Sequence, residues 1–134
     1  MQKIEHIGIA VKDLSAANET YQKLLGIAHY KMEIVESEEV NTSFFQVGES
    51  KIELVASLGA AGIISKFIEK RGEGIHHIAL AVDDIREEMR RLKEAGFILL
   101  HDEPKRGADK KLVCFVHPKD LNGVLIELCQ EAES

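Results

Sequence analysis

Residues 74–82 read GIHHIALAV, and residues 4–11 read the similar IEHIGIAV. Each stretch places a histidine before a run of small and branched apolar residues. Short apolar matches are common by chance, but a polar residue repeated at one register needs an explanation. The two histidines, His6 and His77, are 71 residues apart. If the chain is duplicated, other motifs should recur with a similar separation.

A second motif meets that expectation. Residues 51–54 read KIEL and residues 125–128 read LIEL, so that Glu53 and Glu127 are 74 residues apart. The two separations agree to within three residues across two independent motifs. The sequence therefore predicts an internal duplication.

The predicted elements repeat in the same order. In the first half we expect a strand, a helix and three strands, over residues 3–11, 15–26, 29–36, 41–48 and 50–57. Asp13 or Ser15 caps the first helix, Ala17, Tyr21, Leu24 and Leu25 form its apolar stripe, and Gly26 ends it. In the second half we expect a strand over 74–82, a helix from the Asp84 cap to Gly96, and strands over 97–103, 111–118 and 123–130.

These elements predict an α+β fold of two tandem βαβββ modules, which form a cupped mixed sheet around a metal site. We expect a single domain over residues 1–134, with modules at about 1–58 and about 74–130. A connecting helix over about residues 60–70 joins the modules.

Composition narrows the function. The chain has 134 residues, of which 45% are hydrophobic and 30% charged, as in globular proteins. A net charge of −6 argues against nucleic acid as a partner. Cys114 and Cys129 lack the spacing of a zinc finger and read as buried apolar residues. With no signal peptide or membrane-length apolar run, we expect a cytoplasmic protein without a membrane partner.

Strand alternation predicts a shared face for the repeated polar residues. His6 and His77 share their faces with small residues, whereas the bulky residues point to the other side, under the helices. The same alternation places Glu53 and Glu127 on the roomy face. Two imidazoles and two carboxylates suit a divalent ion such as cobalt, nickel, manganese, zinc or ferrous iron. We predict one such ion per chain.

The other histidines have no such pattern. His76 lies on the bulky face by alternation and reads as a packing residue or one that supports the ligands. His117, before Pro118, reads as a turn or substrate contact. His29 and His101 read as surface residues.

Three longer motifs are more specific than the fold. They are KFIEKRGEGIHHIALAVDDI (66–85), DEPKRGA (102–108) and FVHPKDLNGVLIEL (115–128). Through them the chain resembles the vicinal oxygen chelate (glyoxalase/bleomycin resistance) superfamily along essentially its whole length, and the methylmalonyl-CoA epimerases most closely. The resemblance implies the same four metal ligands that alternation selects: His6, Glu53, His77 and Glu127.

The resemblance implies an isomerase that interconverts the 2R and 2S forms of methylmalonyl-CoA by abstracting the alpha proton. We expect Glu127 as the first base and Glu53 as the second, because epimerisation needs a base on each face of the planar enolate. Some epimerases have a glutamate on the third strand as a base, where this chain has Thr42. Lys110, Lys111 and Lys119 are conceivable contacts for CoA phosphates. A homodimer is expected.

Three alternatives share the fold. Lactoylglutathione lyase (glyoxalase I) would use the same ligands on a thiol-derived substrate, the hemithioacetal of methylglyoxal and glutathione. A ring-cleaving dioxygenase would use ferrous iron with two histidines and one carboxylate, so that the second glutamate counts against it. A non-catalytic antibiotic-binding protein would need no metal ligands at all. The full set of four favours an enzyme.

Overall fold

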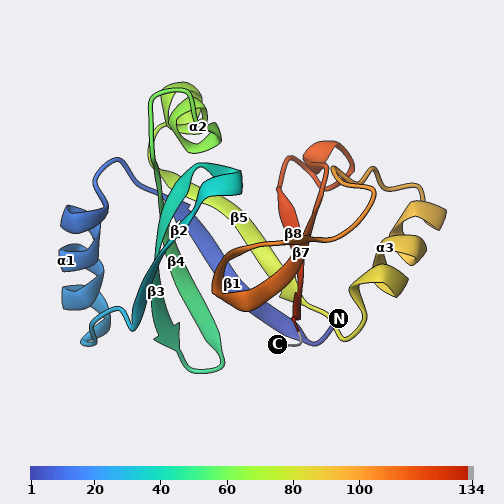
Figure 1. The fold of residues 1–134 in the computed structure, drawn as a ribbon, viewed down its shortest axis with the longest axis horizontal. Helices are drawn as coiled ribbons and strands as arrows, with labels where there is room; N and C mark the ends of the chain where they lie inside the picture. The colour runs from blue at the N-terminus through green and yellow to red at the C-terminus, as the bar shows by residue number, and fades with distance from the viewer. Residues whose placement is uncertain (133–134) are drawn as a thin grey trace. The chain divides into compact units, whose positions relative to one another are not determined.

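The computed structural model describes residues 1–132, which form two compact units (Figure 1). Residues 6–76 make up the first unit, and residues 1–5 with residues 77 onward make up the second. Along the chain, the order strand, helix and three strands occurs twice, with one helix between the two copies. The predicted α+β class and the tandem order are therefore confirmed.

The first unit is a mixed sheet with helices. Its elements are β1 (Lys3–Ala10, from His6 onward), α1 (Leu14–Leu25), β2 (Lys31–Val35), the 3-10 turn η1 (Glu36–Glu38), β3 (Val40–Val47), β4 (Ser50–Ser57) and α2 (Ile63–Arg71). The strand order is β2-β3-β4-β1, in which β1 runs parallel to β4 and the other pairs are antiparallel. The start of β5 (Gly74–Ala81) also belongs to this unit.

Local sequence signals determine where α1 begins and ends. Asp13 has an extended backbone, and its carboxylate accepts the Ala16 N–H at 3.0 Å, as in a standard N-cap. Gly26 ends the helix with φ 74°, a left-handed conformation that glycine adopts without strain. Of the two predicted caps, Asp13 is the right one. Leu24, predicted on the apolar stripe, is 70% exposed because it lies at the edge of that stripe in the last turn.

The helix side of the first sheet holds this unit's apolar core. Phe45 and Leu54 are fully buried there, and Leu14 of α1 packs with them. These residues follow the period of two in each strand, which places the bulky side chains on one face. The opposite face carries Glu53 and His6, together with the buried Phe44.

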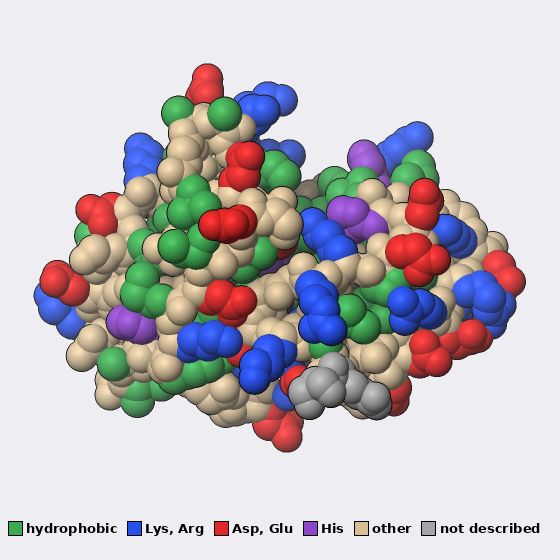
Figure 2. Space-filling model, in the orientation of Figure 1, with side chains coloured by type: hydrophobic (Ala, Val, Ile, Leu, Met, Phe, Trp, Pro, Cys, Tyr) green, Lys and Arg blue, Asp and Glu red, His purple; other side chains and the backbone are tan. Residues whose placement is uncertain are grey.

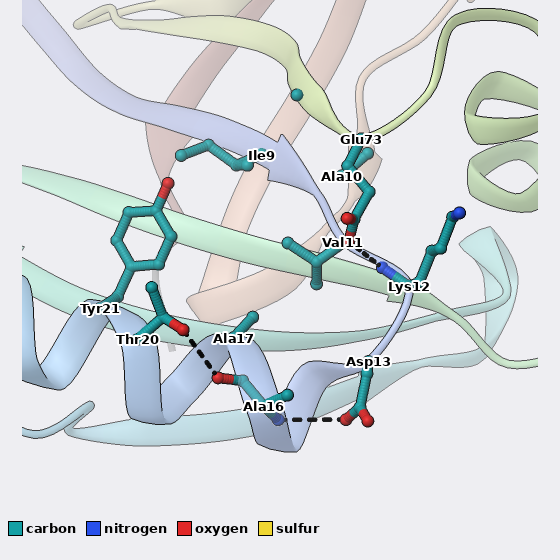
Figure 3. Close-up of a pocket in the computed structure, with 11 residues that line it drawn as sticks. Ile9, Ala10, Val11, Lys12, Asp13, Ala16, Ala17, Thr20, Tyr21 and Glu73 are labelled. Atoms are coloured by element: carbon teal, nitrogen blue, oxygen red, sulfur yellow. Dashed lines mark hydrogen bonds between the residues drawn. The ribbon is translucent and has the colours of Figure 1, made fainter.

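The connector between α2 and β5 is held against the end of β1. The Lys12 N–H donates to the Glu73 carboxylate at 2.7 Å (Figure 3). A cavity of about 470 Å³ lies beside this contact, and Ile9, Val11, Tyr21 and Glu73 are among its lining residues. Ile9 and Val11 point to the side of β1 opposite His6, since alternate residues of a strand face opposite ways.

The second unit repeats this arrangement. Its elements are the rest of β5, α3 (Ile85–Glu94), β6 (Lys105–Arg106), η2 (Ala108–Lys110), β7 (Lys111–Val116), η3 (Pro118–Asp120) and β8 (Ile126–Glu131). The strand order is β5-β8-β7-β6, with β5 parallel to β8. Asp84 caps α3 by accepting the Glu87 N–H at 3.2 Å, as predicted. Ile85, Met89 and Leu92 of α3 are buried in the core.

The predicted strand over residues 97–103 is wrong. Leu99 pairs with Val116, but the next paired residue is Lys105, opposite Val113. The chain thus advances six residues while its partner strand advances three, so a bulge interrupts the pairing. Pro104, which has no N–H to donate, lies in that bulge. The strand is reduced to a bridge at Leu99 and the two residues of β6.

The exposed face of α3 is covered by charges of both signs (Figure 2). The Arg90 guanidinium forms ion pairs with the carboxylates of Glu87 and Glu94, the second at 2.8 Å. The Arg91 guanidinium forms an ion pair with the Glu88 carboxylate at 2.8 Å. The hydrogen bond from Arg90 lowers the pKa of the Glu87 carboxyl below its usual value. Such exposed pairs contribute little to stability.

None of the helices in the described part of the chain could cross a membrane.

Residues 1–5 pack with the second unit rather than with the rest of β1. The Gln2 N–H donates to the Ala81 carbonyl at 2.8 Å, and the Gln2 side chain donates to Asp83. The second unit therefore consists of two segments distant in sequence.

Candidate functional site

The first unit brings His6 and Glu53 together. In the parallel pair of β1 and β4, Glu53 lies opposite Gly8, two residues beyond His6, so that the two side chains share a face. Nδ1 of His6 lies 3.0 Å from a carboxylate oxygen of Glu53. The residues are only 3% and 6% exposed.

The second unit brings His77 and Glu127 together in the same way. Glu127 lies opposite Ala79, again two residues beyond the histidine, in the parallel pair of β5 and β8. Nε2 of His77 lies 3.2 Å from a Glu127 carboxylate oxygen, and both residues are buried. The duplication thus extends to the pairing register. The two copies differ in the ring nitrogen that faces the carboxylate.

Each pair holds a nitrogen and an oxygen donor at a separation that suits a direct hydrogen bond and also two donors to one metal ion. Imidazole nitrogens and carboxylate oxygens bind such ions at about 2.0–2.2 Å, so two donors at right angles lie about 3 Å apart. The distances of 3.0 and 3.2 Å in the two pairs match this value. Burying a carboxylate is costly unless a positive charge compensates it. The donor set of each unit therefore fits a divalent ion.

A phenylalanine stands across the strand from each glutamate. Phe44 lies opposite Glu53 in β3 and β4, and Phe115 lies opposite Glu127 in β7 and β8. Residues opposite one another in an antiparallel pair share a face, so each carboxylate has an apolar neighbour. Neither phenylalanine was singled out in the sequence, although each recurs at the same place in its copy.

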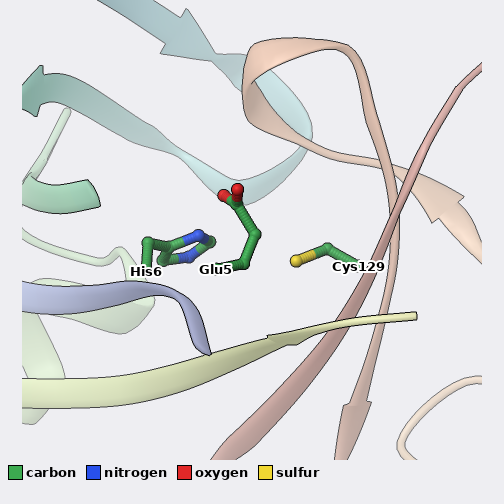
Figure 4. Close-up of side chains that lie close together, drawn as sticks. All are labelled: Glu5, His6 and Cys129. Atoms are coloured by element: carbon green, nitrogen blue, oxygen red, sulfur yellow. The ribbon is translucent and has the colours of Figure 1, made fainter. Parts of the chain in front are cut away.

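Glu5 is a buried acid that the sequence analysis missed. It is 5% exposed, and a carboxylate oxygen of Glu5 lies within 4.8 Å of the Cys129 sulfur (Figure 4). Glu5 precedes His6 in the chain, and its counterpart in the repeat is His76. The sequence feature that could have indicated its burial is the position of an acidic residue inside an otherwise apolar strand.

Two of the remaining histidines lie as expected. His76 packs its ring edge-on against Phe67, with ring centroids 4.9 Å apart, in agreement with a packing role. His117 is a turn residue, because its Nδ1 accepts the Lys119 N–H at 2.9 Å at the start of η3.

The surface positions expected for His29 and His101 are wrong. Both are half-buried, and each has an inaccessible ring nitrogen with no hydrogen-bond partner among the described residues. His29 packs against Phe45, and His101 packs against Phe115. Burial, and to a lesser degree the charge of Lys105, lowers the pKa of His101 below its usual value. The 100–104 bulge positions His101, which sequence alone did not indicate.

Two further predictions concern Thr42 and the lysines. Thr42 is buried in β3, opposite Glu33 of β2, and Glu33 pairs with Lys31 at 3.3 Å.

Lys111 is a poor candidate for a phosphate contact, because it is buried and its ammonium pairs with Glu131. Lys110 and Lys119 are exposed.

Comparison with known proteins identifies similar sequences and structures. The profile of the glyoxalase/bleomycin resistance protein/dioxygenase superfamily matches residues 5–115. The ethylmalonyl-CoA/methylmalonyl-CoA epimerase of Cereibacter sphaeroides is 43% identical over 130 residues, which are 96% of this chain and 97% of that protein.

Solved structures agree with the sequence match. The crystal structure of methylmalonyl-CoA epimerase from Mycobacterium tuberculosis has a TM-score of 0.93 and 37% identity, covering 98% of this chain and 89% of that one. A methylmalonyl-CoA epimerase in complex with methylmalonyl-CoA and NH4+ has a TM-score of 0.95 and 33% identity, covering 98% and 96%.

Proposed function

Because this chain belongs to the glyoxalase/bleomycin resistance protein/dioxygenase superfamily, and within it to the methylmalonyl-CoA epimerases, we propose that it interconverts the 2R and 2S forms of methylmalonyl-CoA. The observation that carries the choice of substrate is the similarity to methylmalonyl-CoA epimerases over nearly the whole chain, and the repeated, buried His–Glu pair supports the metal site. Both copies have the same strand register, and each provides a nitrogen and an oxygen donor about 3 Å apart.

The two units are proposed to act as one vicinal oxygen chelate domain. His6, Glu53, His77 and Glu127 would together hold one divalent ion, for which cobalt, nickel, manganese and zinc are candidates. When bound, such an ion supplies Lewis-acid stabilisation of the negative charge that develops on the substrate thioester.

Glu127 is proposed as the base that removes the alpha proton. Its carboxylate is buried beside Phe115, so water competes little for it, and a thioester alpha carbon held within reach would transfer its proton to an oxygen of Glu127. The proton must return on the opposite face of the planar enolate for the centre to invert.

Glu53 is proposed as the second base. Thr42 cannot accept a proton at neutral pH, and Glu53 is the carboxylate that the repeat places in the position equivalent to Glu127. Each unit would thus contribute one ligand that also acts as a base, one for each face of the substrate.

The competing function is lactoylglutathione lyase, which requires the same kind of site. The two are separated by incubating metal-loaded protein with methylmalonyl-CoA in deuterated water and following alpha-proton exchange by NMR. A parallel sample receives methylglyoxal and glutathione. We expect exchange on the CoA thioester and no thioester product from glutathione. Rapid thioester formation without exchange would overturn the proposal.

A further inference from the structure

Phe115 packs against His77 and lies across the strand from Glu127. Its backbone lies directly opposite Glu127 in the antiparallel pair of β7 and β8, so that the two side chains leave the same face. The ring centroids of Phe115 and His77 are 5.8 Å apart, with an angle of 87° between the planes. This is the edge-to-face arrangement that aromatic pairs prefer.

A second imidazole also packs against Phe115. The His101 ring lies 6.2 Å from the Phe115 ring, at 55°, and the 100–104 bulge brings it there. Phe115 therefore packs against two imidazoles, which restrict the orientation of its own ring. A Phe115 ring with a fixed orientation can in turn limit the rotation of the His77 ring.

The corresponding phenylalanine of the first unit is Phe44, which also has an aromatic neighbour. Phe44 packs against the Tyr30 ring at 5.8 Å, and the Lys31 ammonium lies 5.9 Å from its centroid. The two units also differ in the histidine atom that faces the carboxylate, which is Nδ1 in His6 and Nε2 in His77.

We infer that Phe115 is a positioning residue, which holds the His77 ring so that Nε2 faces Glu127 and the metal position. Rotation about the last side-chain bond of histidine has only broad preferences, so an isolated His77 ring would sample several orientations. An edge-on aromatic neighbour removes that freedom. The inference rests on the proposed function, because it assumes that His77 is a ligand.

The test compares Phe115→Leu with Phe97→Leu. Phe97 is a half-buried phenylalanine of the same unit that packs against the core under α3, so its loss reports general destabilisation. Affinity for Co²⁺ is measured by competition with a chelator, and the visible spectrum of the Co²⁺-loaded protein reports ligand geometry. Melting temperatures show whether the two variants are destabilised to a similar degree.

Loss of a hydrogen-bond partner that orients a ligand weakens metal binding by about 10- to 100-fold, which sets the scale for a packing partner. We expect Phe115→Leu to weaken Co²⁺ binding by at least about tenfold and to alter the spectrum. Phe97→Leu should do neither, and Phe115→Tyr, which keeps the ring, should bind like the wild type. Equal affinity in the two leucine variants would overturn the inference while the metal site stands. A wild-type protein that binds no stoichiometric Co²⁺ would instead refute the metal site itself, and this inference with it.

Discussion

The Glu127 carboxylate lies 3.2 Å from Nε2 of His77, and a two-residue offset between neighbouring parallel strands produces this contact. Glu127 is paired with Ala79, and Ala79 points to the same side of β5 as His77. The first unit repeats the offset with Gly8 and Glu53. A small residue in the intervening position leaves room for both side chains, so the pairing register and the side-chain sizes together position the donors.

We predict one divalent ion per chain, bound by His6, Glu53, His77 and Glu127. Elemental analysis and titration of chelated protein should give one equivalent, which a His6→Ala, His77→Ala double variant loses. The matched control is His29→Ala, His117→Ala, which also removes two imidazoles. The control should still bind one equivalent, and stoichiometric binding that survives in the first variant would contradict the ligand assignment.

Metal removal should destabilise the fold. An ion that binds only the folded chain adds about 2.7 kcal/mol at a free concentration of 100 times its dissociation constant. Chelation also leaves buried carboxylates without a compensating charge. Thermal unfolding with and without chelator should therefore show a lower melting temperature for the metal-free protein. Identical melting curves would speak against the site.

Glu127→Gln should abolish alpha-proton exchange while most metal binding is retained. A glutamine can coordinate through its carbonyl oxygen but cannot accept the proton. Glu53→Gln should be milder, because Glu127 can still remove the alpha proton from one face of the substrate. Exchange in deuterated water and metal titration are measured on each variant. Full activity of Glu127→Gln would show that another residue is the base.

The position of Thr42 offers a sharper test of Glu53. Thr42 pairs with Val55, whereas Glu53 pairs with Phe44, so that Thr42 and Glu53 are diagonal neighbours on one face. A glutamate in place of Thr42 could therefore bring a carboxylate close to that of Glu53. We expect Thr42→Glu to restore part of the exchange lost in Glu53→Gln, whereas Thr42→Gln should not. Equal rates for the two double variants would contradict a base role at this place.

His101 should make stability depend on pH. Burial holds its pKa in the fold below 6.5, the value for the unfolded chain. As pH falls through 6.5, the unfolded chain takes up a proton that the folded chain does not, so stability decreases until the folded pKa is reached. Urea unfolding between about pH 8 and about pH 5 should show a steeper loss for the wild type than for His101→Gln. Parallel curves would contradict the prediction.

Removing either of the two helix caps should lower the free energy of unfolding by a similar amount. Asp13→Ala and Asp84→Ala each remove the acceptor of an N-terminal N–H, at a cost of about 1 kcal/mol of unfolding free energy. The exposed Asp102, which caps no helix, provides Asp102→Ala as a charge-matched control that should change stability by less than about 0.5 kcal/mol. Equal free energies of unfolding for all three variants would show that the two capping hydrogen bonds do not stabilise the fold.

The sequence was most informative where local chemistry repeats. The duplication, the helix caps at Asp13 and Asp84 and the shared faces of the His–Glu pairs follow from spacing and alternation alone. The family resemblance and the isomerase class that it implied are confirmed by the relatives. The ligand set, the bases, the homodimer and the cytoplasmic location stay predictions.

Other features depend on tertiary pairing. The run over residues 97–103 is apolar enough for a strand, and nothing local shows that three extra residues bulge from the ladder before Lys105. The half-buried position of His101 follows from that bulge. Glu5 was missed because alternation assigned its face to packing, whereas its burial depends on neighbours such as Cys129, distant in sequence.

The division of the chain after Glu5 has a consequence for protein synthesis. Residues 6–76 are continuous, so this unit has all of its strands once they have left the ribosome. Residues 1–5 are made first, yet the Ala81 carbonyl that accepts the Gln2 N–H is made much later. Residues 1–5 must therefore remain available until the second half emerges, and closing so long a loop has an entropic cost. A ribosome that pauses before residue 77 would hold a chain whose first strand is only partly paired.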